Sequence, residues 1–287
     1  MYNKERLTEA FIILNMKTDS HLIKEVLHTG RFLIPYRIYE NKGPQIICVN
    51  GVQQSMAMWL TFVARFKQDY NIVLFDFPNQ GKGKILSGPS QVSLDEQVEI
   101  LLAMIDKTGF TRDATLCSAS WGGVIAVAFA SKYPNRVKRL ILASLGTKPN
   151  KKMVETIKKG SSLHISNRDQ MAHTLIKSFG ESLSAKMKES IVNQFRNMKE
   201  VNLQAFYEHG LFVIASKKLS EIVDLGAIKE KTILLNGEKD TIIDLDDVKF
   251  LASQIPDCEL KIIKGVGHFL HMENEKVLDI YTEILRQ

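Results

Sequence analysis

Short apolar runs along the chain alternate with longer segments in which apolar residues recur at helical spacing. The short runs predict strands, and the longer segments predict amphipathic helices. The expected strands are Gln45 to Val49, Asn71 to Phe75, Ala114 to Cys117, Arg139 to Ala143, Thr232 to Leu235 and Leu260 to Ile263, with a β-hairpin at Arg31 to Glu40. The expected helices are Met56 to Phe66, Ser93 to Lys107, Val124 to Lys132 and Asn274 to Leu285. This alternation predicts an α/β fold with a mostly parallel sheet covered by helices on both faces.

The pattern changes between Thr147 and about Leu225, where helix follows helix without a convincing strand. We therefore expect one core made of residues 29–146 and 226–287, a helical insertion at residues 147–225 and a helical N-terminal extension at residues 1–28. An apolar stripe in the insertion favours helices that pack on one another. If its apolar face covered the turn with Ser120, that face would also suit an acyl chain. The stripe comprises Leu163, Ile165, Met171, Leu175, Ile176, Phe179, Leu183, Met187, Ile191, Phe195 and Met198.

The composition is that of an ordinary globular enzyme. The chain has 287 residues, of which 45% are hydrophobic and 24% charged, and this suits one large domain with an insertion. Apolar runs end well short of the roughly 20 residues that a membrane span requires, and the N-terminus lacks the pattern of a secretory signal. The cysteines Cys48, Cys117 and Cys258 lie far apart and mostly in expected strands, which favours reduced thiols in a cytoplasmic protein.

A turn of small residues, Ser118-Ala119-Ser120-Trp121-Gly122-Gly123, follows an expected strand and precedes a helix. This context is typical of a nucleophile elbow, which holds a serine on a strained strand-to-helix turn with its hydroxyl exposed. Ser120 is therefore the candidate nucleophile. Because Ser118 stands where glycine is usual, the motif alone fits equally well a serine that only caps a helix.

A serine nucleophile needs an imidazole to accept its proton and a carboxylate to orient that imidazole. Asp240 lies in the loop after the expected strand Thr232 to Leu235, and His268 lies in a glycine-rich loop after Leu260 to Ile263. Loops that follow parallel strands meet at the same edge of a sheet. The order serine, aspartate, histidine matches an α/β-hydrolase and differs from the orders of the chymotrypsin and subtilisin folds.

Other titratable residues compete for these roles. Glu238 shares the loop of Asp240 but lies nearer the strand, so it is the second choice. His271 lies three residues after His268, yet no further metal-binding motif accompanies the pair, so neither a metal nor another cofactor is expected. The acidic residues Asp244, Asp246 and Asp247 have the pattern of a helix start. The other histidines are interpreted as structural or surface residues: His21, His28, His164, His173 and His209.

Acyl transfer also needs backbone amides directed at the oxyanion that forms in the transition state. One amide is expected from Trp121, directly after the nucleophile. The second is expected from the loop after the strand Gln45 to Val49, where Val52 follows Asn50 and Gly51. An Asn-Gly turn without a catalytic duty is the alternative for this loop.

Several segments together are similar to the hydroxyalkanoyloxyalkanoic acid synthases of rhamnolipid biosynthesis, which are acyltransferases with the α/β-hydrolase fold. The resemblance covers about Gly43 to Met272 and implies a Ser120, Asp240 and His268 triad. It implies that the serine takes a β-hydroxyacyl chain from a carrier-protein or coenzyme A thioester and passes it to the hydroxyl of a second chain. It also implies that the insertion at residues 147–225 forms a lid. The segments are Cys48-Val49-Asn50-Gly51, Val73 to Pro78, Asp95 to Ala103, Ser118 to Gly123, Asn236-Gly237 with Asp240, and Gly267 to Leu270.

The net charge of +6 arises largely from lysines that are concentrated in the insertion. Exposed lysines usually only keep a protein soluble, but a basic rim could also dock coenzyme A phosphates or an acidic acyl carrier protein. Gly81-Lys82-Gly83 is not a phosphate-binding loop, and the absence of a basic and aromatic recognition motif argues against nucleic acid. The insertion lysines are Lys148, Lys151, Lys152, Lys158, Lys159, Lys177, Lys186, Lys188 and Lys199.

Three classes of function stay open on these grounds. The first is an acyltransferase acting on (3-hydroxy)acyl thioesters, and the second is a hydrolase with the same triad, whether an esterase, a thioesterase or a C–C bond hydrolase. The third is a receptor that keeps the pocket of the fold without turnover. An intact candidate triad favours the two enzymatic classes.

Overall fold

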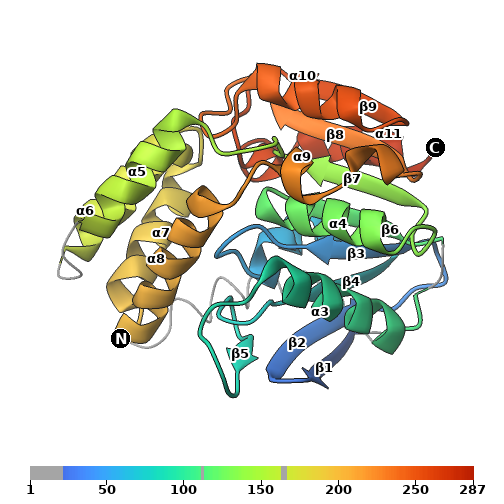
Figure 1. Ribbon diagram of the computed structural model, residues 1–287, viewed down its shortest axis with the longest axis horizontal. Helices are drawn as coiled ribbons and strands as arrows, with labels where there is room; N and C mark the ends of the chain where they lie inside the picture. The colour runs from blue at the N-terminus through green and yellow to red at the C-terminus, as the bar shows by residue number, and fades with distance from the viewer. Residues whose placement is uncertain (1–21, 111–112, 163–166) are drawn as a thin grey trace.

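One twisted sheet with helices on both faces forms the centre of the molecule (Figure 1). The computed structural model describes residues 22–110, 113–162 and 167–287. The strands are β1 (Leu22–Thr29), β2 (Phe32–Tyr39), β3 (Gln45–Val49), β4 (Asn71–Phe75), β5 (Lys84–Ile85), β6 (Thr115–Ala119), β7 (Arg139–Ala143), β8 (Lys231–Gly237) and β9 (Cys258–Ile263). The helices are η1 (Met56–Trp59), α2 (Leu60–Phe66), α3 (Leu94–Lys107), α4 (Trp121–Lys132), α5 (Lys151–Ser162), α6 (Arg168–Phe179), α7 (Ala185–Asn197), α8 (Glu200–Ala215), α9 (Leu219–Ile222), η2 (Leu225–Ala227), α10 (Leu245–Gln254), η3 (Leu270–Met272) and α11 (Val277–Leu285).

The strands lie in the order β1-β2-β4-β3-β6-β7-β8-β9, and β5 pairs with β2. Pairing is antiparallel from β1 to β4 and parallel from β4 to β9. The expected α/β architecture and its parallel sheet are therefore confirmed. Parallel strands carry their carboxyl ends to one edge, so the loops after β3, β6, β7, β8 and β9 gather there.

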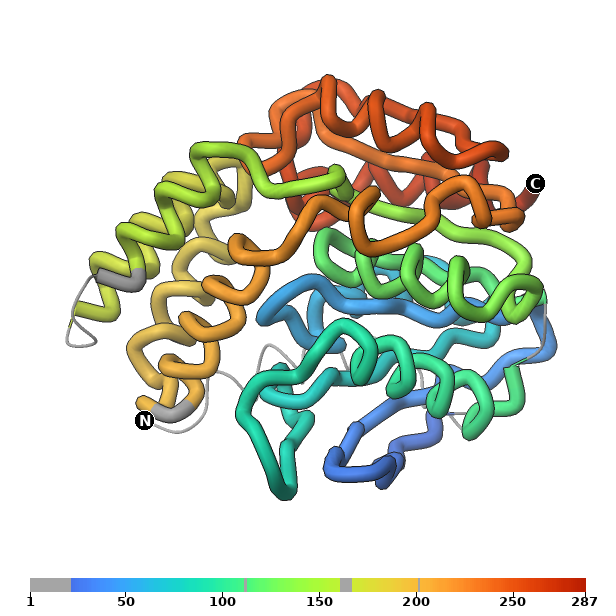
Figure 2. The backbone as a smooth tube through the Cα atoms, viewed as in Figure 1, coloured from blue at the N-terminus to red at the C-terminus, as the bar shows by residue number. Residues whose placement is uncertain are grey.

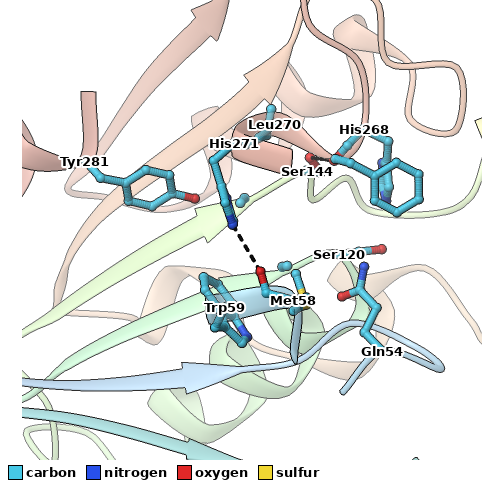
Figure 3. Close-up of a pocket in the computed structure, with 12 residues that line it drawn as sticks. Gln54, Met58, Trp59, Ser120, Ser144, His268, Leu270, His271 and Tyr281 are labelled. Carbon is cyan, nitrogen blue, oxygen red and sulfur yellow. Dashed lines mark hydrogen bonds between the residues drawn. The ribbon is translucent and has the colours of Figure 1, made fainter. Parts of the chain in front are cut away.

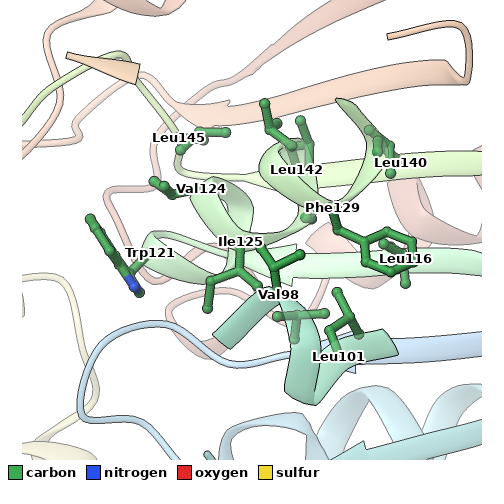
Figure 4. Close-up of a cluster of buried hydrophobic side chains, with 14 of the residues drawn as sticks. Val98, Leu101, Leu116, Trp121, Val124, Ile125, Phe129, Leu140, Leu142 and Leu145 are labelled. Carbon is green, nitrogen blue, oxygen red and sulfur yellow. The ribbon is translucent and has the colours of Figure 1, made fainter. Parts of the chain in front are cut away.

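Each central strand is apolar on both faces because helices cover both sides of the sheet. Ile47 and Val49 of β3 belong to the core cluster on the side covered by α3 and α4. Figure 4 shows part of this cluster, with Val98 and Leu101 of α3 beside Ile125 and Phe129 of α4. Ile46 and Cys48 of the same strand face the opposite side, where η1, α2 and α11 pack. Because alternate residues enter different cores, a slip of one residue would exchange the two sets, and this fixes the strand register.

The N-terminal part of the sheet corrects two predictions. Leu22–Thr29 is strand β1 and not the end of a helical extension, and its partner in a β-hairpin is β2. Gly30 makes the turn between them with a φ of 51°, a left-handed conformation that glycine adopts without strain. The segment Arg31 to Glu40 therefore supplies one strand of the hairpin and not both. Residues 1–21 of the predicted extension lie outside the described residues.

Between β7 and β8 the described part of the chain contains helices α5 to α9 and no strand. Figure 2 shows this insertion leaving the sheet at its carboxyl edge and returning to β8. Part of the apolar stripe forms a small separate core, in which Met171, Val192, Phe195 and Leu203 are buried together. Leu163 and Ile165 of the predicted stripe lie outside the described residues. Of the helices described, none is both long and apolar enough to cross a bilayer.

Candidate active site

Ser120 lies at the sharp turn between β6 and α4. Its backbone has a φ of 49° and a ψ of −121°, a conformation that is rare for any residue other than glycine. Two backbone hydrogen bonds hold the turn: the Ser120 amide donates to the carbonyl of Ala143 at 2.8 Å, and the Gly123 amide donates to the carbonyl of Ser120 at 2.7 Å. Ser120 therefore has the strained strand-to-helix geometry that the sequence predicts for a nucleophile elbow.

The small residues around Ser120 allow α4 to approach the neighbouring strand closely. A Cβ atom added at Gly122 would lie 2.3 Å from the carbonyl oxygen of Val49 and 2.6 Å from that of Asn50. Ser118, which replaces the usual glycine two positions before the nucleophile, is fully buried and donates a hydrogen bond to the carbonyl of Ile141. The serine at this position therefore satisfies its hydroxyl within the sheet.

Asp240 and His268 form a buried hydrogen-bonded pair in the loops after β8 and β9. His268 Nδ1 lies 2.9 Å from Asp240 Oδ2, and the two side chains are 5% and 0% exposed. The second carboxylate oxygen accepts hydrogen bonds from the amides of Ile242 at 2.8 Å and Ile243 at 3.2 Å. Burial alone would raise the pKa of Asp240, but His268 and the two amides outweigh it and keep the pKa of this carboxyl below its ordinary value.

Two further side chains hold the loop that carries His268. Glu273 accepts hydrogen bonds from the amides of Gly267 at 2.6 Å and Phe269 at 3.0 Å, on either side of the histidine. Ser144 donates from its hydroxyl to the His268 carbonyl at 2.6 Å. The sequence interpretation missed both residues. Ser144 could have been found by its place directly after β7 at the carboxyl edge, the place that Ser120 has after β6.

Ser120 and His268 line the same small cavity, on whose opposing walls Figure 3 shows them. The floor is aromatic, because His271 stacks on Trp59 with ring centroids 5.8 Å apart. Burial lowers the pKa of His271, and its Nε2 lies 3.4 Å from the carbonyl oxygen of Met58. His271 is therefore a core residue behind the site, and within the described residues no cluster of side chains is suited to hold a metal ion.

The two residues expected to supply oxyanion amides share a second cavity with Ser120. Val52 and Trp121 both line it. Trp121 is the first residue of α4, so its amide has no acceptor within the helix and is available to a ligand. The indole of Trp121 donates to Gln97 Oε1 at 2.9 Å, which fixes the ring at the cavity wall.

This second cavity has mainly apolar walls and lies between the sheet edge and the insertion. Core residues and insertion residues contribute to the same walls, so the insertion forms one side of the cavity that Ser120 lines. Lys148 and Lys217 line it as well, and both residues are exposed. Its apolar lining comprises Val52, Val124, Leu145, Met153, Val213, Leu219, Ile222, Ile242 and Ile243.

The competing carboxylates have structural contacts away from His268. Glu238 accepts a hydrogen bond from the Gly265 amide at 3.1 Å and is exposed. Asp244 is the N-cap residue of α10, as its sequence pattern predicts. Asp247, in the first turn of α10, accepts a hydrogen bond from the Thr147 amide at 2.6 Å and thereby ties the start of the insertion to the core.

Comparisons with known proteins agree with this geometry. The model of the family described as alpha/beta hydrolase fold matches residues 44–275. An (R)-3-hydroxydecanoyl-ACP:CoA transacylase of Pseudomonas aeruginosa is 24% identical over 250 residues, which cover 86% of this chain and 82% of that protein. A monoacylglycerol lipase of Homo sapiens is 24% identical over 260 residues, covering 86% of this chain and 76% of the lipase.

The solved structures that resemble this one have the same fold. An α/β hydrolase enzyme from a Medee basin deep-sea metagenome library superposes with a TM-score of 0.80 at 20% identity, covering 92% of this chain and 98% of the other. A thermophilic esterase from Thermogutta terrifontis gives a TM-score of 0.75 at 19% identity, covering 93% and 98%. The predicted resemblance to acyltransferases of this fold is thus confirmed, and the chain belongs to the α/β hydrolase fold family.

Proposed function

We propose that the protein is a serine-dependent acyl-transfer enzyme in which Ser120 is the nucleophile, His268 the general base and Asp240 the residue that orients the imidazole. The single observation that carries this proposal is the buried Asp240–His268 hydrogen bond at a cavity that Ser120 also lines. With Nδ1–H donated to a carboxylate, Nε2 of the ring is left free to accept a proton.

The reaction proceeds in two halves. His268 takes the hydroxyl proton of Ser120 as the oxygen attacks the acyl carbonyl, and the amides of Val52 and Trp121 stabilise the oxyanion. The leaving thiol or alcohol receives the proton from His268, and the acyl group stays on Ser120 as an ester. Water or a second hydroxyl compound then gives up its proton to His268 and attacks the acyl-enzyme, and His268 returns this proton to the Ser120 oxygen as the acid or the new ester is released.

The second cavity supports an acyl chain as the transferred group. Its walls are mainly apolar and include Ser120, so a hydrocarbon chain attached to the carbonyl would replace water there. Lys148 and Lys217 at the same cavity support an anionic donor, such as the phosphates of coenzyme A or an acidic carrier protein. The transacylase from Pseudomonas aeruginosa is named for such donors, and we propose a (3-hydroxy)acyl thioester as the donor of this enzyme.

Intact-protein mass spectrometry tests the chemistry directly. The protein mixed with a 3-hydroxyacyl coenzyme A thioester should gain the acyl mass on Ser120, and Ser120→Ala should gain none. Free acid in the product marks a hydrolase, and an ester of two 3-hydroxyacyl units marks a transferase. Turnover that survives Ser120→Ala would refute the proposed nucleophile, and binding without acylation would mark a receptor.

The donor assignment has a separate test with a matched pair of substrates. The combined Lys148→Glu and Lys217→Glu variant should raise KM about five- to tenfold for the coenzyme A thioester, since each exposed charge contact contributes modestly. The same acyl group on N-acetylcysteamine carries no phosphate and should be turned over equally by both proteins. Equal KM values for the coenzyme A thioester would contradict the assignment of these lysines to an anionic donor.

A further inference from the structure

Helix α8 of the insertion contacts both segments that supply the proposed oxyanion amides. His209 Nδ1 lies 3.1 Å from the side-chain nitrogen of Gln53, the residue next to Val52. One helical turn later, the ring of Phe212 packs edge-on against Trp121, with centroids 5.4 Å apart and planes at 73°. The insertion therefore touches the oxyanion region at two points, one on each of the two segments.

The contact between His209 and Gln53 defines the state of the histidine ring. A side-chain amide nitrogen can only donate, so His209 Nδ1 accepts and the ring proton is on Nε2. Burial lowers the pKa of His209 to about 4, so the ring is neutral near neutral pH and keeps its acceptor. The hydrogen bond is thus available over the pH range in which a serine triad works.

The loop that carries Val52 needs such a contact. Gln53 has a φ of 55°, a left-handed conformation that is unfavourable for a residue with a side chain. Within the loop, the amide of Gly51 is satisfied by Gln54 Oε1 at 2.8 Å. The Gln53 side chain is instead directed to the insertion, so its hydrogen bond to His209 stabilises the backbone beside Val52 from outside the loop.

On the side that faces the core loops, helix α8 does not pack against a continuous apolar core. A cavity of about 470 Å³ lies between α8 and the core loops, and His209 and Phe212 line it together with Phe77, Gln80 and Gln97. Where a helix faces a cavity, the few contacts that bridge to the other side carry more of its positioning than they would in a packed interface. His209 supplies one of these contacts.

We propose that His209 is a positioning residue for the oxyanion hole: through its hydrogen bond to Gln53 it holds the amide of Val52 in place while charge develops on the substrate carbonyl. The inference rests on the proposed acyl transfer at Ser120. It gives the insertion a part in transition-state stabilisation in addition to substrate enclosure. Its signature is a loss of kcat without a matching change in KM, because the oxyanion forms after the substrate has bound.

The test compares three variants with the wild type. His209→Ala removes the acceptor, His209→Gln keeps an acceptor oxygen at the end of the side chain, and Gln53→Ala removes the donor from the core side. Complete loss of an oxyanion donor costs about 100- to 1000-fold in kcat, so a displaced donor should cost about tenfold or more. His173→Ala is the matched control, because His173 is on α6 of the same insertion and its exposed ring has a hydrogen bond to the carbonyl of Asp169 within α6.

For p-nitrophenyl esters we expect both alanine variants to lose about tenfold in kcat with KM within about threefold, and His209→Gln to recover most of the rate. The double variant His209→Ala/Gln53→Ala should be no slower than either single variant, because both remove the same hydrogen bond. A trifluoromethyl ketone forms a tetrahedral oxyanion on the nucleophile. Its inhibition constant should therefore rise in the alanine variants by the same factor by which kcat/KM falls.

The outcomes separate this inference from the proposed function. If the wild type shows no Ser120-dependent turnover, the proposed acyl transfer fails. If turnover depends on Ser120 but His209→Ala keeps kcat and trifluoromethyl ketone affinity within about twofold of wild type, only the role of His209 is refuted. Additive losses in the double variant, or a His209→Gln variant as slow as His209→Ala, would also refute it, since the hydrogen bond would then not be the cause.

Discussion

The substitution Asp240→Asn examines the buried pair most directly, because the structure dictates which way the new amide would face. Asp240 Oδ1 accepts hydrogen bonds from the amides of Ile242 and Ile243. Asparagine must keep its oxygen there, so its NH₂ group replaces Oδ2 and points at His268 Nδ1. A donor at this place forces Nδ1 to be unprotonated and puts the ring proton on Nε2, where a base for Ser120 is needed.

The expected loss follows from this change of tautomer. We predict that kcat falls by about 1000- to 10,000-fold, which corresponds to about 4 to 5.5 kcal/mol in the activation free energy. Steady-state hydrolysis of a p-nitrophenyl ester measures it, with circular dichroism to verify that the near-isosteric variant is folded. Glu238→Gln is the matched control in the same loop and should keep its activity, since Glu238 contacts the Gly265 amide and not the histidine. An Asp240→Asn enzyme within about tenfold of wild type would refute the assignment of Asp240 as the orienting carboxylate.

Other predictions concern stability and chain-length preference. Gly122→Ala should lower the free energy of unfolding by about 3 kcal/mol in urea titrations, because the added Cβ would meet the Val49 carbonyl. The control Gly160→Ala in helix α5 has room for a Cβ and should raise the free energy of unfolding by up to about 1 kcal/mol. His209 has a native pKa of about 4 against an ordinary value of 6.5. Between these values the unfolded chain binds a proton that the native ring does not, so the free energy of unfolding falls as pH drops through this window, by at most about 3 kcal/mol. The His209→Gln variant should lack this part of the acid destabilisation. If wild type and variant showed the same pH dependence of stability, the burial of a neutral His209 would be refuted. Val213→Trp fills the apolar cavity beside Ser120 and should reduce kcat/KM for octanoyl esters by about tenfold while acetyl esters react as before.

The sequence was most informative where the same residue serves both fold and chemistry. Central strands are recognisable because both faces are apolar, and loops after parallel strands lie at one edge by geometry alone. That is why Ser120, Asp240 and His268 could be predicted to converge although they are far apart in sequence. The start of α3 was likewise predictable from a local pattern: the expected helix began at Ser93, and Ser93 is the N-cap residue, which forms a reciprocal capping box with Glu96.

Residues whose role depends on tertiary contacts were not predictable in this way. Strand β1 has exposed positions on an edge strand, so its apolar pattern is weak and was interpreted as helical. Glu273 and Ser144 act on the backbone around His268. The place of Ser144 directly after β7 marks it as a residue of the carboxyl edge, but nothing in the sequence indicates that either residue contacts the histidine loop. His209 was interpreted as an ordinary structural or surface histidine because its partner Gln53 is remote in sequence and joined to it only by the packing of the insertion.

The division between core and insertion gives a physical reason why proteins of this family can differ in reaction while sharing a fold. The loops carrying Ser120, Asp240 and His268 follow β6, β8 and β9, which together with the intervening β7 form one side of the sheet. Strands packed on both faces tolerate no slip in register. The insertion has its own small core around Met171 and Phe195 and meets the site through a few contacts. Its cavity walls can therefore change without disturbing the central strands. In the proposed two-step reaction, how tightly the insertion covers Ser120 should decide whether water or a second hydroxyl reaches the acyl-enzyme, and substitutions on the insertion should therefore alter the ratio of hydrolysis to transfer.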